Sequence, residues 1–281
     1  MKKVVVTGAG GYIGRHVIKK LCDAGYDTYA VDLHKKDWDE RAKFCNVKIF
    51  SGNPDIYEEL GRPDVLIHLA WRDGFVHDSP AHMNDLSSHM IFLRNMIEGG
   101  LPLLTVMGTM HEVGYWEGAI DENTPCHPMS QYGIAKNAMR QSLMLMTKDG
   151  SCKLHWLRAY YITGDDMRGS NIFSKIAKAA MEGKKDFPFT TGKNKYDFID
   201  VDNLAEMIVA ASVQNKINGI INVCTGHPIT LAEKVENFIK EHHYDIKLKY
   251  GAFPERAYDS PGEWGDASLI NRIMEAAANK H

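Results

Sequence analysis

The sequence predicts an α/β protein with a doubly wound parallel sheet, and two observations carry this prediction. Short apolar strands alternate with amphipathic helices over residues 2–159, an order that implies parallel pairing through helical crossovers. A glycine-rich turn from Gly8 to Gly14 joins the first strand to the first helix, where such folds bind dinucleotides. After Gly164 the alternation changes, so we expect residues 1–163 to form the main domain and residues 164–281 a smaller, partly interleaved region.

Each element is expected from its apolar pattern. β-branched runs bounded by Gly, Asp or Pro predict strands, at residues 2–6, 27–33, 47–50, 64–70, 101–107 and 153–159. Apolar residues at helical spacing predict helices, at residues 12–24, 79–98, 128–146, 172–181, 204–212, 231–240 and 269–278. We expect the strand and helix around residues 195–215 to return to the first domain.

The composition excludes several classes of protein. The chain has 281 residues with a formal net charge of −3, so its charge gives no reason to expect nucleic acid or an anionic membrane as a partner. We expect no secretory leader, because the apolar run behind the Met-Lys-Lys start is only Val4–Val6, and no membrane span, because no run approaches roughly 20 apolar residues. Its cysteines are scattered and odd in number, which favours free thiols in the cytoplasm and no metal site.

The turn after the first strand has its glycines at Gly8, Gly11 and Gly14. Glycine is needed where the backbone turns sharply and where a pyrophosphate approaches it closely. The helix that begins near Tyr12 directs unpaired N–H groups towards that pyrophosphate. The alternative is a purely structural turn, but its place at the first strand–helix junction favours dinucleotide binding.

Asp32 ends the second expected strand, about 20 residues after the turn, where a carboxylate accepts hydrogen bonds from the adenosine ribose. This carboxylate would repel a 2′-phosphate and so mildly favours NAD(H) over NADP(H). Lys35 and Lys36 follow, and they could instead hold a 2′-phosphate. Both cofactors remain open on the sequence.

A phenol and an ammonium lie one helical turn apart at Tyr132 and Lys136. A lysine so placed can lower the tyrosine pKa and hold the cofactor ribose, while the tyrosine moves a proton to or from a substrate oxygen. Thr109 lies at the carboxyl end of the fifth expected strand, the sheet edge where such folds keep their ligands. Its hydroxyl is expected to contact the same oxygen.

These segments together resemble the extended short-chain dehydrogenase/reductase family, the group of sugar-nucleotide epimerases, dehydratases and ketoreductases. The resemblance spans residues 2–270 and rests on Thr7–Gly14, Leu66–Ala70, Gly108–Thr109, Tyr132–Lys136, Leu157–Arg158, Asp197–Ala205 and Ile221–Val223. It implies a Rossmann domain, a catalytic set of Thr109, Tyr132 and Lys136, and a homodimer formed through residues 79–98 and 128–146. It also implies cofactor contacts from Gly8, Gly11, Tyr12, Ile13, Gly14, Asp32, Leu69, Ala70, Tyr132 and Lys136.

The chain departs from the family pattern at several substrate positions. Sugar-nucleotide dehydratases of this family usually carry Asp-Glu after the catalytic Thr, whereas Met110 and His111 stand here, which disfavours dehydration. His111 is expected either to pack in the loop or to act on the substrate, and Trp71 either to floor the sugar site or to pack beneath its loop. Arg256 matches the arginine that meets the nucleotide phosphates, or it is a surface residue. Tyr196 stands where the family often has Arg.

The reaction expected from this resemblance is reduction of a UDP- or dTDP-linked 4-keto-6-deoxyhexose at C4 by NAD(P)H. Tyr132, with Lys136 and Thr109, would protonate the C4 oxygen. One alternative is a nucleotide-sugar C4 epimerase that retains tightly bound NAD+. An alternative of another class is a non-catalytic dinucleotide sensor or scaffold.

Overall fold

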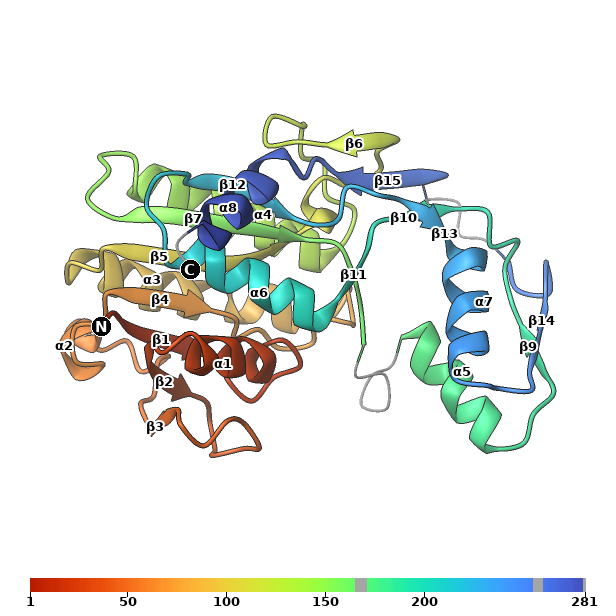
Figure 1. The fold of residues 1–281 in the computed structure, drawn as a ribbon. Helices are drawn as coiled ribbons and strands as arrows, with labels where there is room; N and C mark the ends of the chain where they lie inside the picture. Colours follow the sequence, from red (N-terminus) through yellow and green to blue (C-terminus); the bar gives the residue numbers. More distant parts are fainter. Residues whose placement is uncertain (165–170, 255–259, 280–281) are drawn as a thin grey trace.

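A computed structural model describes residues 1–164, 171–254 and 260–279. The centre of the fold is a seven-stranded parallel sheet with helices on both faces (Figure 1), which confirms the predicted doubly wound α/β class. Its strand order is β12-β7-β5-β4-β1-β2-β3. The strands are β1 (Lys3–Thr7), β2 (Asp27–Val31), β3 (Lys43–Cys45), β4 (Val65–His68), β5 (Leu103–Thr109), β7 (Lys153–Ala159) and β12 (Gly219–Val223). Within the described residues, no helix is long and apolar enough to cross a membrane.

The helices form two layers because successive strand side chains point to opposite faces of the sheet. The helices are α1 (Gly14–Asp23), α2 (Ile56–Glu59), α3 (Ala81–Glu98), α4 (Gln131–Met146), α5 (Ile172–Met181), α6 (Val201–Ser212), α7 (Leu231–Glu241) and α8 (Ser268–Ala278). Val4 and Val6 of β1 face a core shared with α1, α6 and α8. Val5 faces the other core, shared with α3 and α4. All three valines are fully buried, so a continuous apolar run is what this central strand requires.

A smaller lobe lies beyond the carboxyl ends of the strands, at the right of Figure 1. It holds α5 and α7, whose apolar faces share a third core around Phe173, Ile176, Val235 and Phe238. The short strands outside the main sheet are β6 (Gly118–Ile120), β8 (Tyr161–Thr163), β9 (Asp186–Pro188), β10 (Lys195–Tyr196), β11 (Phe198–Asp200), β13 (Ile229–Thr230), β14 (Lys247–Lys249) and β15 (Gly262–Gly265). Strands β9 and β14 pair with each other at the outer side of this lobe (Figure 1).

The residues after Gly164 contribute to both the main body and the smaller lobe. Strand β12 pairs with β7 at the edge of the main sheet, and α6 and α8 pack in the core that contains α1. Strand β11 instead pairs with β8 in a separate two-stranded ladder. The expected functional boundary near residue 163 stays a prediction.

The expected third strand at residues 47–50 was wrong. The chain pairs with β2 four to five residues earlier, through β3, with Ala30 opposite Phe44. Val47 and Ile49 alternate as a strand would, but they pack against the core under α3 and α4. Their alternation reflects packing against that core. An alternating apolar pattern shows that one side of a segment is buried, but it does not show which strand, if any, the segment pairs with. The short helix α2 was not expected.

Candidate active site

The glycine turn at the end of β1 presents bare backbone. A Cβ on Gly8, whose φ is +69°, would lie 2.7 Å from the Ala70 nitrogen, and one on Gly14 would lie 2.2 Å from the Gly8 oxygen. The Gly11 N–H donates to the Gly8 oxygen at 3.0 Å, which closes the turn, and Ile13 immediately precedes α1. Glycine is therefore required both for the turn and for its approach to the loop after β4. This open backbone at a helix N-terminus fits the pyrophosphate of a dinucleotide.

Hydrogen bonds connect the glycine turn and its flanking residues to two other segments. The Leu69 N–H donates to the Thr7 oxygen at 3.1 Å, so the Leu69–Ala70 segment runs beside the turn. The Tyr12 hydroxyl donates to the Gly164 oxygen at 2.5 Å. The turn, the loop after β4 and the end of β8 thus meet at one edge of the sheet, where a switch in strand order opens a crevice.

Asp32 lies directly beyond β2 and faces the same turn. Its Oδ2 accepts from the Gly10 N–H at 2.9 Å, and its side chain is 8% exposed. Lys36 Nζ lies 3.3 Å from Asp32 Oδ1, and the Lys36 side chain covers Gly10 so closely that a Cβ there would lie 2.4 Å away from it. The carboxylate is thus held beside the glycine turn, with one of the two lysines already paired to it.

Thr109, Tyr132 and Lys136 come together at the carboxyl end of β5. Helix α4 begins just before Tyr132, where the Ser130 hydroxyl caps it by accepting from the Gly133 N–H at 3.1 Å. A side-chain hydrogen bond joins Tyr132 to Thr109. Burial nevertheless raises the pKa of Tyr132 above its ordinary value, so the phenol keeps its proton at neutral pH. Lys136 Nζ lies 5.9 Å from the Tyr132 ring centroid.

Gly133 makes this arrangement possible. A Cβ at this position would lie 2.3 Å from the His111 oxygen, so α4 can pack against the turn η1 (Met110–Glu112) only with glycine here. The Tyr132 N–H donates to the His77 oxygen at 2.8 Å, which fixes the start of α4 to the loop before α3. The spacing of the tyrosine and lysine is local, but their distance from Thr109 depends on this close approach.

Lys136 is buried, at 3% exposure. Its Nζ donates to the Met107 oxygen at 2.8 Å. Burial lowers the pKa of Lys136 to about 7, against the opposing effect of the Glu112 charge. The amine can therefore gain or lose charge near neutral pH, 5.9 Å from the centroid of the Tyr132 ring.

Glu112 is a component of this site that the sequence did not lead us to expect. It is fully buried, and its Oε1 accepts from the Thr109 N–H at 2.7 Å and from Trp156 Nε1 at 3.0 Å. Arg140 and Arg158 lie 3.3 and 3.7 Å from its Oε2. The available signal was the Thr-x-x-Glu spacing of a capping box, which this turn forms. Glu112 holds Thr109 in place instead of facing the substrate.

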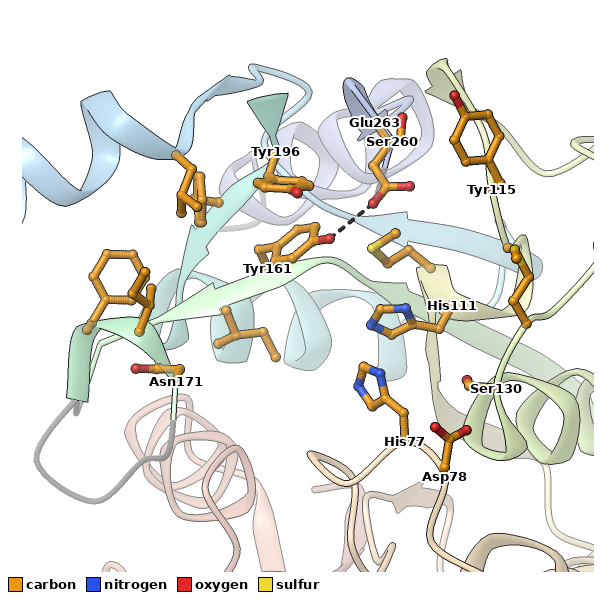
Figure 2. Close-up of a pocket in the computed structure, with 18 residues that line it drawn as sticks. His77, Asp78, His111, Tyr115, Ser130, Tyr161, Asn171, Tyr196, Ser260 and Glu263 are labelled. Atoms are coloured by element: carbon orange, nitrogen blue, oxygen red, sulfur yellow. Dashed lines mark hydrogen bonds between the residues drawn. The ribbon is translucent and has the colours of Figure 1, made fainter. Parts of the chain in front are cut away.

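A cavity of about 490 Å³ opens between the main sheet and the smaller lobe. Thr109, Tyr132 and Lys136 are not among the described residues that line it, but the Tyr132 ring packs against His77 and His111, which are. His77 and His111 line one side, and Tyr161 and Glu263 line another (Figure 2). The Tyr161 hydroxyl donates to Glu263 Oε1 at 3.0 Å. A cavity of this size suits a small organic ligand. None of the described residues that line it is Lys or Arg.

His111 and Tyr196 face this cavity, as Figure 2 shows. The His111 ring lies 4.2 Å from that of His77 and 6.2 Å from that of Tyr132, between centroids. Burial, together with His77, lowers the pKa of His111 to about 3, so it offers a neutral imidazole. Tyr196 packs on Tyr161 at 4.3 Å between centroids, an aromatic surface where the family pattern has a cation.

Of the other two predicted substrate residues, the structure describes Trp71 alone. Trp71 is not among the residues that line the cavity, and its indole packs against His89 and beneath Lys136. Arg256 lies outside the described residues. Within the described residues, no group of acidic, histidine and cysteine side chains could hold a metal ion.

Comparison with known proteins gives relatives along almost the whole chain. A dTDP-6-deoxy-L-talose 4-dehydrogenase (NAD(+)) of Aggregatibacter actinomycetemcomitans is 42% identical over 270 residues, covering 93% of this chain and 98% of the relative. A UDP-glucose 4-epimerase of Lactobacillus helveticus is 25% identical, covering 97% and 91% of the two chains. A UDP-glucose-4-epimerase structure from Stenotrophomonas maltophila, with bound NAD and formylated UDP-arabinopyranose, superposes with a TM-score of 0.85 at 20% identity, covering 98% of this chain and 93% of that one.

The family model described as "NAD dependent epimerase/dehydratase family" matches residues 4–224. That range runs from β1 through β12, so it contains the glycine turn, Asp32, Thr109, Tyr132 and Lys136. The match confirms the resemblance found in the sequence. This chain belongs to the NAD-dependent epimerase/dehydratase family.

Proposed function

We propose that this protein interconverts a nucleotide-linked 4-keto-6-deoxyhexose and its 4-hydroxy form with NAD(H) as cofactor, most readily in the direction of reduction. The observation that carries the proposal is the arrangement of Thr109, Tyr132 and Lys136: a hydrogen bond joins Thr109 to Tyr132, and Lys136 Nζ lies 5.9 Å from the Tyr132 ring centroid. The Tyr132 ring packs against His77 and His111, which line a cavity of about 490 Å³. The relative at 42% identity, with its dTDP-sugar 4-dehydrogenase name and its matching length, supports a dTDP-sugar ahead of a UDP-sugar.

The chain's own residues supply the proton chemistry. When bound, the nicotinamide supplies the hydride for C4. Tyr132 donates its proton to the C4 oxygen, and Thr109 hydrogen-bonds that oxygen and the phenol. Lys136 contributes positive charge beside the phenol, which stabilises the tyrosinate that proton donation leaves. The raised pKa of Tyr132 keeps the phenol protonated until the substrate oxygen accepts its proton.

The remaining predicted contacts complete the proposal. We assign the dinucleotide to residues 1–163, through the glycine turn, Asp32 and Leu69–Ala70, and the nucleotide sugar to residues 164–281 together with His111. Arg256 keeps its predicted place at the nucleotide phosphates. The stretch of Met110 and His111 supports reduction over dehydration, because neither residue is a carboxylate that could act in elimination.

A stoichiometric assay tests the proposal. Purified protein is incubated with a dTDP-linked 4-keto-6-deoxyhexose and NADH, and both compounds are followed. We expect one NADH consumed for each ketosugar reduced. The alternative, a C4 epimerase, is supported by the UDP-sugar 4-epimerases among the relatives, and it would interconvert 4-hydroxy sugars with no net use of NADH. That second result would replace the reductase assignment.

Asp32 provides a test of the cofactor. We expect Asp32→Ala to weaken NADH binding roughly tenfold or more, because the ribose loses a charged hydrogen-bond acceptor. Binding of NADPH should improve, since the carboxylate that repels its 2′-phosphate is gone and Lys36 is released from its ion pair. Dissociation constants for both nucleotides measure this, with the exposed Asp37→Ala as control. Unchanged affinity for both nucleotides would show that Asp32 does not meet the ribose.

We also propose a homodimer in the cytoplasm. Helices α3 and α4, which pack side by side on one face of the sheet, expose the apolar side chains Met83, Ile91, Ile134, Met144 and Leu145. Burial of these side chains against a second copy would remove a large apolar surface from water. All five cysteines are free thiols, which suits a reducing compartment.

A further inference from the structure

Trp71 lies in the loop that follows β4, and its indole is held on more than one side. Its Nε1–H donates to His82 Nδ1 at 3.0 Å, and His82 Nε2 in turn donates to the Val76 oxygen at 2.9 Å. The indole stacks on His89 of α3, with 4.6 Å between centroids and 27° between planes. A side chain fixed by a hydrogen bond and a stacked ring has little freedom to reorient.

The ammonium of Lys136 lies over this indole. Nζ is 3.8 Å from the Trp71 ring centroid, well within the range of a cation–π contact, and tryptophan is the most favourable partner for one. The same Nζ donates one hydrogen bond, to the Met107 oxygen at 2.8 Å. A buried ammonium has three donors and loses its hydration, so the negative face of an aromatic ring compensates for part of that loss.

Lys136 carries the positive charge next to the Trp71 indole, because His89 and His68 beside it are uncharged. His89 Nδ1 lies 2.9 Å from His68 Nε2, and His68 Nδ1 lies 2.7 Å from the Thr7 hydroxyl. Burial and the Lys136 charge lower the pKa of His89 to about 3, and burial lowers that of His68 as well. Both imidazoles are therefore neutral at physiological pH.

Other titratable groups also act on Lys136. Glu112 from η1 favours its charged form. His68 of β4 and His89 of α3 are neutral, and Tyr132 lies one turn earlier on α4, with its ring 6.3 Å from that of Trp71 between centroids. Trp71 is thus an uncharged contact that favours the protonated amine. The Met107 oxygen also favours the protonated amine, because a hydrogen bond donated by an ammonium is stronger than one donated by a neutral amine.

We propose that Trp71 is a positioning residue for Lys136, whose ammonium it keeps charged and aimed into the catalytic site through contact with its indole face. The inference rests on the proposed role of Lys136 beside Tyr132 and deepens that role. This role explains why a large aromatic residue follows Leu69–Ala70 although it does not line the cavity. Histidines hold its indole edge and one face of its ring.

The test is the titration of Lys136 in ligand-free protein, followed by NMR of lysine Cε-labelled protein and assigned with Lys136→Met. The variants are Trp71→Phe, which keeps an aromatic face, and Trp71→Met, which keeps an apolar side chain without one. We expect the pKa of Lys136 to fall by roughly half a unit to one and a half units in Trp71→Met and by less in Trp71→Phe. The pH at which kcat/KM for ketosugar reduction declines should move down in the same order.

The control is Trp38→Leu, which removes a buried indole (8% exposed) that packs against Phe44 of the edge strand β3. It should lower thermal stability without moving the Lys136 titration. A pKa in Trp71→Met that equals or exceeds the wild-type value would overturn the proposal and leave Trp71 as packing alone. Because this titration needs neither cofactor nor substrate, its failure would be distinct from failure of the stoichiometric assay.

Discussion

Replacing Tyr132 with Phe should lower kcat for ketosugar reduction by about 10²–10⁴-fold, the usual contribution of a positioned general acid. The substitution removes the hydroxyl that would protonate the C4 oxygen and that Thr109 contacts. The ring remains, so its packing against His77, at 5.5 Å between centroids, should persist. Single-turnover measurements with NADH and the 4-ketosugar, compared with wild type, give the change.

Two controls separate loss of the proton donor from damage to the site. The dissociation constant for NADH should stay close to that of wild type, because the glycine turn and Asp32 are unaltered. Tyr57→Phe on α2 removes a phenol far from the cavity and should leave turnover unchanged. Wild-type turnover by Tyr132→Phe on every accepted substrate would remove Tyr132 from the mechanism, whereas weakened NADH binding would indicate a structural effect.

Glu112→Gln should lower the free energy of unfolding by about 3–5 kcal/mol, the usual cost of leaving a buried charge without its partner. Glutamine has nearly the same shape and can still accept the Thr109 N–H, now 2.7 Å from Oε1. It carries no charge to offset Arg140 and Arg158, of which Arg158 is fully buried. Urea unfolding monitored by tryptophan fluorescence measures the difference.

Glu117→Gln is the matched control, because this exposed glutamate lies five positions away and its hydrogen bond to Tyr115 is at the surface. It should change stability by less than about 0.5 kcal/mol. If Glu112→Gln were equally mild, Glu112 would not be ionised in the folded protein. Arg140 and Arg158 would then be neutralised by other groups.

Much of the fold can be predicted from local pattern. The run Val4–Val6 predicts a strand buried on both faces, and the structure buries all three side chains. Helices such as 172–181 follow from the period of their apolar residues. The turn from Gly8 to Gly14 can also be recognised locally, from its glycine spacing at a strand–helix junction, although the atoms that exclude a Cβ at Gly8 belong to the distant Leu69–Ala70 segment. Wherever the requirement lies within a few residues, the sequence states it directly.

The sequence by itself therefore determined the fold class, the family and the place of the glycine turn. Only the tertiary structure decided that residues 43–45 pair with β2, that Glu112 supports Thr109 from within a buried ion cluster, and that Trp71 lies under Lys136 instead of in the cavity. These contacts join segments from different elements. A side chain's pattern shows whether it is buried, but which partner covers it depends on how strands and helices pack, and the packing follows from the whole chain.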